Sequence, residues 1–166
     1  MERSQVCCFS GYRPEKFNLS PDEFGSIMQE LETAGRNAAA DGYRLFVSGM
    51  SRGFDLWAAE TVLKLRKELP IQLLCAVPFD GQSAGWEPAW QALHRRVLLE
   101  ADLVQSLSRE YTPDCYFVRN RFMVQGCSRL ICWYDGRSGG TEFTVRCAKR
   151  NGLELVNLAD RQLSLY

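Results

Sequence analysis

The stretch SGMSRGFDLWAAE, residues 48–60, leads from an apolar run through a short loop into a segment with helical spacing. The loop holds two glycines and one arginine, and Asp55 follows two residues later. Its glycine spacing matches neither the P-loop nor the dinucleotide-binding pattern. Either the glycines serve the geometry of the turn alone, or the loop faces an anion, which the N-terminus of a helix favours. The rest of the chain decides what surrounds this loop.

Six apolar runs rich in β-branched or aromatic residues recur along the chain. They are near-continuous rather than alternating, which predicts strands that are buried on both faces. The predicted strands are QVCCFS (5–10), RLFVS (44–48), IQLLCAV (71–77), DLVQS (102–106), RLICWY (129–134) and LELVNL (153–158).

The segments between these runs have helical spacing. The predicted helices cover residues 21–40, 54–68, 87–100, 116–126 and 141–151. Ser20 and Pro21 form a good N-cap and first turn for the first helix, Pro70 closes the second, and Gly152 suits the C-terminus of the last.

Alternation of strands and helices is typical of an α/β fold with a mostly parallel sheet and helices on both faces. The chain contains no linker, internal repeat or low-complexity tract. We therefore expect one Rossmann-like domain over residues 1–166, with a core at about 5–157 and a short C-terminal tail, DRQLSLY (160–166).

Bulk composition narrows the classes of function. Lys plus Arg and Asp plus Glu both number 20, and this zero formal charge argues against binding nucleic acid by bulk charge. The seven cysteines form no CxxC pair, so no metal site is expected, and they are interpreted as reduced core residues of a cytoplasmic protein. No stretch is apolar enough to span a membrane, and no targeting segment is visible.

Candidate binding loops follow four of the predicted strands. Ligands of open parallel sheets bind beyond the carboxyl ends of the strands, so these loops are expected at one edge. The loops are SGYRP (10–14), SGMSRGFD (48–55), PFDGQ (78–82) and DGRSGGTE (135–142). Arg13, Arg52 and Arg137 are candidates for charge-assisted hydrogen bonds to a phosphate. Together the loops indicate a small phosphate-bearing ligand.

Other chemistry has little support in the sequence. The single histidine, His94, is expected as a surface or half-buried helix residue, and no nucleophile is placed near it for a catalytic triad. Trp86 and Trp90 are interpreted as packing residues.

Five motifs in this order carry a family resemblance: SGYRP, SGMSRGFDLWAAE, VPFDGQ followed by Trp86, RNRFMV and WYDGRSGGTEFTV. Together they resemble the YpsA-like family of the SLOG superfamily over residues 5–157. That superfamily includes the LOG proteins and the DNA-processing protein DprA. The resemblance implies a Rossmann-like fold and a pocket for a nucleotide or nucleotide-derived ligand of the NAD or ADP-ribose type, with no required cofactor.

The ligand-binding residues expected from the loops and motifs share small size, polarity or positive charge. They are Ser10, Gly11, Arg13, Ser48, Gly49, Ser51, Arg52, Gly53, Asp55, Pro78, Gln82, Arg119, Asn120, Asp135, Gly136, Gly139, Gly140 and Thr141. Within the opening loop, Gly49 is assigned the sharp exit from the strand and Gly53 the close approach of the backbone.

LOG enzymes cleave an N-glycosidic bond with an Arg-Lys pair and a PGGxGTxxE loop. By resemblance Arg119 takes the place of the arginine, Asn120 replaces the lysine, and Thr144 stands where the glutamate is expected. Glu142 and Asp55 remain as candidate carboxylates, since glycoside cleavage requires one. Asp55 either stabilises the first turn of its helix or holds a ribose hydroxyl, and Glu60 is expected outside direct contact.

Four functions follow for testing, the last of them a scaffold protein that acts through partners. The first is a sensor or signalling domain that binds a nucleotide-like ligand. The alternative is a LOG-like N-glycosidic (phosphoribo)hydrolase with Arg119, Glu142 or Asp55 as catalytic residues. Single-stranded DNA binding is less favoured because the net charge is zero. A homodimer is a reasonable expectation for this kind of fold.

Overall fold

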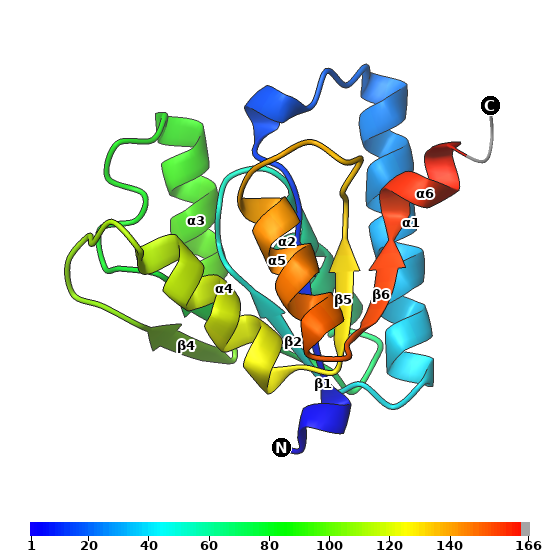
Figure 1. The fold of residues 1–166 in the computed structure, drawn as a ribbon. Helices are drawn as coiled ribbons and strands as arrows, with labels where there is room; N and C mark the ends of the chain where they lie inside the picture. The colour runs from blue at the N-terminus through cyan, green and yellow to red at the C-terminus, as the bar shows by residue number, and fades with distance from the viewer. Residues whose placement is uncertain (164–166) are drawn as a thin grey trace.

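The computed structural model of the protein describes residues 1–163 and contains one six-stranded sheet, with every strand pair parallel (Figure 1). The strands are β1 (Val6–Ser10), β2 (Leu45–Ser48), β3 (Gln72–Val77), β4 (Leu103–Ser106), β5 (Arg129–Cys132) and β6 (Glu154–Asn157). The helices are α1 (Pro21–Ala40), α2 (Phe54–Leu65), α3 (Pro88–Glu100), α4 (Cys115–Gly126), α5 (Gly140–Arg150) and α6 (Leu158–Leu163), with a short 3-10 turn, η2 (Pro14–Lys16), after β1. The predicted α/β class and Rossmann-like fold are confirmed.

Local signals place the helix ends. The hydroxyl of Ser20 accepts a hydrogen bond from the Glu23 N–H, which caps α1 as expected. Gly152 has φ +73° just beyond α5, a conformation that glycine adopts readily. The second helix is shorter than predicted, because α2 ends at Leu65 and turns fill the interval to Pro70.

The sheet separates two helical layers. Helices α1, α2, α3 and α6 pack on one face, and α4 and α5 cover the other (Figure 1). Alternate strand residues point into the two layers: Phe9 and Phe46 pack with the first group of helices, whereas Cys8, Val47 and Leu130 pack with the second. The central strands are thus buried on both faces, and their sequence lacks the alternation of a half-exposed strand.

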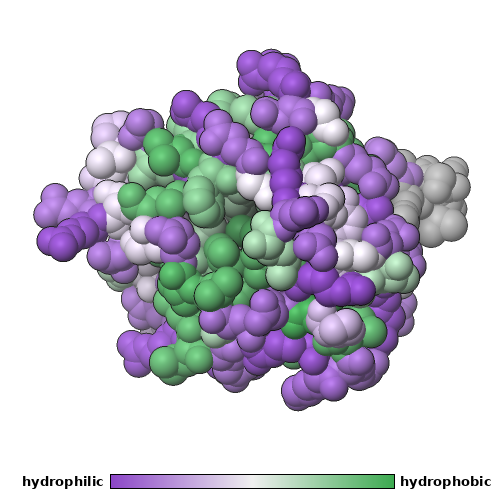
Figure 2. Space-filling view, turned by 90° about the horizontal axis from the view of Figure 1, so that it is seen from below, coloured by the Kyte–Doolittle hydropathy of each residue, from purple (hydrophilic) through white to green (hydrophobic). Residues whose placement is uncertain are grey.

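The strand β4 was predicted to be buried on both faces, and this prediction is wrong, since all four of its residues are exposed. It is an edge strand, which pairs only with β3. The helices leave both of its faces partly open to solvent. Leu103 and Val104 are each about half exposed, and Leu99 of α3 and Phe122 of α4 are exposed as well. In the view from below, apolar surface gathers on the side where β4 and α4 lie (Figure 2).

The first residues of the expected C-terminal tail, 160–163, are part of a helix. Residues 158–163 form α6, with Leu158 and Ala159 buried, while the last three residues of the expected tail lie outside the described part. All seven cysteines are free and buried, in agreement with their interpretation as core residues. None of the helices within residues 1–163 combines the length and apolarity that crossing a bilayer requires.

Candidate functional site

The strand order reverses at β1. The chain builds β1 to β4 outward in one direction and then places β5 and β6 on the other side of β1. This reversal opens a crevice beyond the carboxyl ends of β1 and β5, where ligands of open α/β sheets bind. A pocket of about 420 Å³ lies there. Its lining consists of Ser10, Gly11, Tyr12, Arg13, Glu15, Lys16, Ser51, Asp55, Tyr116, Phe117, Arg119, Asn120, Gly140 and Thr141.

The loop that opens α2 packs directly against the loop after β1. Gly53 has φ +86°, and a Cβ there would lie 2.6 Å from the carbonyl oxygen of Tyr12, so glycine allows the loop after β1 to approach closely. That carbonyl accepts a hydrogen bond from the Phe54 N–H. A Cβ on Gly11 would lie 2.3 Å from the Phe54 ring. Only glycine fits these two contacts, which hold the two loops together.

Gly49 directly follows Ser48, the last residue of β2, and packs against Arg119. The left-handed turn residue is Met50, which has φ +66° and is fully buried. A Cβ on Gly49 would lie 2.8 Å from Nε of Arg119, so this glycine provides room for the guanidinium. Arg119 donates from Nη1 to the Gly49 carbonyl and from Nε to Oδ1 of Asn120. The loop therefore fixes a buried arginine in the lining of the pocket.

Asp55 is a buried carboxylate in the first turn of α2, with 5% of the residue exposed. Its Oδ2 accepts from the Ser51 N–H at 3.3 Å. Its Oδ1 is buried and has no hydrogen-bond partner within the described residues. Burial raises the pKa of Asp55 to about 6, although the charges of Arg119 and Arg13 and the N–H groups of Ser51 and Gly11 act in the opposite direction.

This raised pKa predicts that the ionised carboxylate destabilises the fold. The folded-state pKa of about 6 exceeds the reference value of 3.8, so the contribution to stability is largest below pH 4 and is lost as pH rises to 6. Asp55→Asn should therefore raise the free energy of unfolding at pH 7.5 by about 3 kcal/mol. Urea denaturation should show most of this gain disappearing at pH 4.5. A gain that does not change with pH, or a loss at pH 7.5, contradicts the expectation, and the exposed Asp22→Asn serves as the control.

Three cations line the pocket, Arg13, Lys16 and Arg119, and none of them forms an ion pair with a carboxylate among residues 1–163. The Arg13 guanidinium lies 5.2 Å from the ring centroid of Tyr116, and Arg119 lies 5.7 Å from the same ring. Lys16 donates to the Ser138 carbonyl at 2.6 Å and so lies beside the N-terminus of α5. These cations and the positive end of the α5 dipole favour an anion in the pocket.

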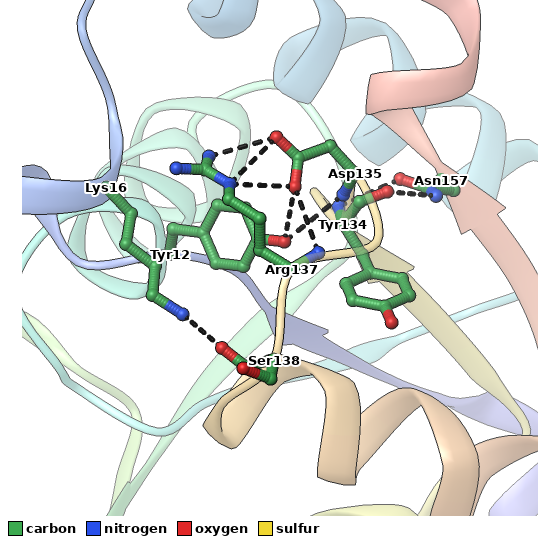
Figure 3. Close-up of polar contacts among 7 residues, drawn as sticks. All are labelled: Tyr12, Lys16, Tyr134, Asp135, Arg137, Ser138 and Asn157. Carbon is green, nitrogen blue, oxygen red and sulfur yellow. Dashed lines mark hydrogen bonds and ion pairs between the residues drawn. The ribbon is translucent and has the colours of Figure 1, made fainter.

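A polar cluster anchors the loop between β5 and α5 to the loop after β1 (Figure 3). The Tyr12 hydroxyl donates to Asp135 Oδ1 at 2.7 Å and accepts from the Asp135 N–H at 3.2 Å. Arg137 pairs with the same carboxylate at 2.9 Å, so its charge is largely neutralised. Asn157 braces the start of the loop through both backbone polar groups of Tyr134. The cluster positions the N-terminus of α5 beside Lys16.

Several predicted site residues lie outside the pocket lining. They are Ser48, Gly49, Arg52, Gly53, Pro78, Gln82, Asp135, Gly136, Gly139 and Glu142. Arg52 pairs with Glu15, and Gln82 donates to the Gly49 carbonyl at 3.2 Å. Glu142 accepts from the Tyr134 hydroxyl at 3.0 Å and pairs with Arg146. Most of these residues therefore support the loops rather than face the pocket.

Three further side chains that the sequence analysis discussed are His94, Glu60 and Thr144. The expected surface or half-buried placement of His94 is wrong, since it is 5% exposed and its Nε2 lies 3.0 Å from Gln82 Oε1. Glu60 pairs with Arg96 and lies outside the pocket lining, as expected. Thr144 is buried and donates to the Gly140 carbonyl at 3.0 Å.

Five lining residues were not singled out from the sequence as ligand-binding residues: Tyr12, Glu15, Lys16, Tyr116 and Phe117. A signal existed for Tyr116, because it lies three residues before Arg119 in a predicted helix and residues at that spacing share a face. Lys16 carries no such signal, since only the η2 turn brings it back over the pocket.

The fold and the pocket define a Rossmann-like domain with a crevice at the reversal of strand order. The YpsA family model, described as the YspA SLOG family, matches residues 7–155. The chain therefore belongs to this YpsA-like SLOG family, and the resemblance in the sequence is confirmed.

The similar proteins agree with this membership. UPF0398 proteins from Bacillus thuringiensis (strain Al Hakam) and Bacillus cereus (strain AH187) are each 26% identical over 155 residues, covering 89% of this chain and 84% of theirs. DNA processing protein A from Helicobacter pylori matches with a TM-score of 0.64 at 18% identity, over 98% of this chain and 73% of that one. DprA from Streptococcus pneumoniae gives 0.63 at 16% identity, over 98% and 62%. The two structural matches show the shared fold.

Proposed function

We propose that this protein binds a nucleotide or nucleotide-derived phosphate compound, of the NAD or ADP-ribose type, and acts as a sensor or signalling domain. The observation that carries the proposal is that Arg13 and Lys16 line the pocket without an ion-pair partner among the described residues, with Lys16 beside the N-terminus of α5. Phosphate is the common biological anion that backbone N–H groups and cationic side chains hold together.

The rest of the pocket fits such a ligand. Tyr116 and Phe117 present aromatic rings in the lining, and an aromatic ring stacks on a nucleobase. Its volume of about 420 Å³ lies within the range of about 300–1,000 Å³ that is usual for small-molecule sites. Glu15 is the second carboxylate of the lining, but its charge is paired with Arg52.

Loss of the two cations should abolish phosphate recognition without unfolding the protein. We expect AMP, ADP-ribose or NAD to raise the melting temperature of the wild type, and Arg13→Ala/Lys16→Ala to weaken the binding of the active compound at least tenfold. Each removed charge-assisted hydrogen bond contributes about 1.5–3 kcal/mol. Thermal-shift titration followed by calorimetry measures both effects.

The matched control is Arg95→Ala/Arg121→Ala, which removes two exposed arginines outside the pocket lining. This variant should bind like the wild type. Equal weakening in both double variants indicates general charge attraction, and the absence of a shift with any phosphate compound contradicts the proposal.

A second candidate function is hydrolysis of an N-glycosidic bond in the same ligand. Asp55 favours it, because it is a carboxylate in the pocket lining near the charge of Arg119, whereas Glu142 is engaged by Tyr134 and Arg146. Asp55 would stabilise the developing cationic sugar or activate water. Release of free base from a nucleoside monophosphate, lost in Asp55→Ala and kept in Glu142→Ala, supports this activity.

Single-stranded DNA is the third ligand to test, since the Helicobacter pylori neighbour is described by its single-stranded DNA binding mode. The zero net charge of this chain disfavours it. Binding of a single-stranded oligonucleotide that weakens steeply with salt and exceeds that of AMP favours this function over the first.

A further inference from the structure

Asp55 has features that phosphate binding alone does not require. It is a buried carboxylate in the pocket lining, and one of its two oxygens has no hydrogen-bond partner among residues 1–163. We propose that Asp55 is a hydroxyl-binding subsite, so that the pocket selects phosphate compounds with a free ribose hydroxyl over their deoxy counterparts. This inference rests on the proposed function and names a part of the ligand other than its phosphate.

Stabilisation of α2 does not explain why position 55 holds a buried carboxylate. An acid that caps a helix accepts from the N–H groups of the first turn that follows it. The hydrogen bond of Asp55 instead comes from Ser51, four residues earlier and outside the helix. Interaction with the helix dipole needs no burial, because exposed acids in the first turn already gain it.

Support of the loop does not explain the charge, since the backbone N–H groups that act on the carboxylate, those of Ser51 and Gly11, also bond to a neutral acceptor. The Ser51 N–H occupies Oδ2, and a neutral asparagine oxygen would accept the same bond. The negative charge remains unexplained, although burial of a carboxylate has a substantial energetic cost. Such a cost is common where a residue serves binding rather than stability.

The charges around Asp55 restrict what can bind to it. A phosphate is repelled by the carboxylate itself, and a cationic group is repelled by the nearby Arg119 and Arg13, whose charges both act on Asp55. A neutral donor avoids both penalties. A sugar hydroxyl is such a donor, and its hydrogen bond to a carboxylate is stronger than one to a neutral acceptor.

The cations, the carboxylate and the aromatic ring of the pocket suit one ligand that carries both a phosphate and a hydroxyl group. The cations Arg13 and Lys16 belong to the segment after β1, whereas Asp55 belongs to α2, and all three line the same pocket. Tyr116 contributes an aromatic ring from a third element, α4. A ribose phosphate bearing a base places an anion, a diol and a π-face on one molecule.

The experiment compares AMP with 2′-deoxy-AMP and 3′-deoxy-AMP by calorimetry at pH 7.5, in the wild type and in Asp55→Asn. We expect the wild type to bind AMP at least tenfold more tightly than one of the deoxy compounds. Asp55→Asn should reduce that ratio below threefold while binding the deoxy compound as well as the wild type or better, because a negative charge has been removed. Asp22→Asn, which removes an exposed carboxylate outside the pocket lining, should keep the wild-type ratio.

The outcomes separate this inference from the proposed function. Binding of all three compounds with equal affinity by the wild type overturns the hydroxyl subsite and leaves phosphate binding intact. An unchanged ratio in Asp55→Asn also overturns it, because the discrimination then arises elsewhere. Binding of none of the three compounds contradicts both proposals. Asp55→Asn is expected to fold, since it removes a buried charge, and its urea denaturation confirms this in the same samples.

Discussion

Arg119→Met should lower the free energy of unfolding by about 3–5 kcal/mol at pH 7.5, the usual effect of removing one partner from a buried charge arrangement. Methionine fills similar space but leaves the Gly49 carbonyl without its donor and Asp55 without the charge that lowers its pKa. Chemical denaturation measures the loss. The control is Arg121→Met on the same helix, which is exposed and should change stability by less than about 1 kcal/mol.

The double variant Arg119→Met/Asp55→Asn tests whether the two charges act together. Removing the Asp55 charge should stabilise the Arg119→Met protein by more than it stabilises the wild type, because the isolated carboxylate is the more costly one. Strictly additive effects would show that Arg119 stabilises the fold only through its hydrogen bonds to Gly49 and Asn120.

Gly53→Ala is expected to lower the free energy of unfolding by about 2–4 kcal/mol, from a strained left-handed backbone together with a steric clash. The new Cβ would lie 2.6 Å from the Tyr12 carbonyl oxygen and 3.0 Å from atoms of Pro14. Because these atoms belong to the segment that carries Arg13, phosphate binding should weaken as well. Denaturation at fixed pH and a ligand titration measure the two effects.

The matched control is Gly25→Ala in α1, where a Cβ meets nothing within 4 Å. Alanine there should stabilise the protein by about 0.5–1 kcal/mol, because glycine is unfavourable inside a helix. A Gly53→Ala protein as stable as this control contradicts the account of the contact between the two loops.

Much of the fold could be predicted because the central strands are buried on both faces. Runs such as VCCFS at β1 lack alternation, and that pattern occurs when helices cover both sides of a parallel sheet. The exposure of β4 could not be predicted from DLVQS, since an apolar run does not reveal whether its strand lies at an edge. Sheet order depends on which helices cross which face, and the chain encodes this only through tertiary packing.

The sequence predicted the position of the candidate site better than it predicted the individual residues that line it. Loops after parallel strands meet at one edge, and three of the four predicted loops contribute to the pocket. The sequence cannot show which arginines are free, because Arg52 is paired with Glu15 and Arg137 with Asp135 only after the chain has folded. Glu15 precedes Arg52 by 37 residues, beyond the reach of any local pattern.

A titration of ¹⁵N-labelled protein with AMP, followed by amide chemical shifts, tests the central claim that the crevice between β1 and β5 binds a nucleotide-like phosphate. The account expects saturable shifts at Gly11, Ser51, Gly140 and Thr141, which line the pocket, and none at Gln125 and Asn151 in the groove between α4 and α5. Shifts confined to that second groove, or no saturable shift at millimolar AMP, would contradict it.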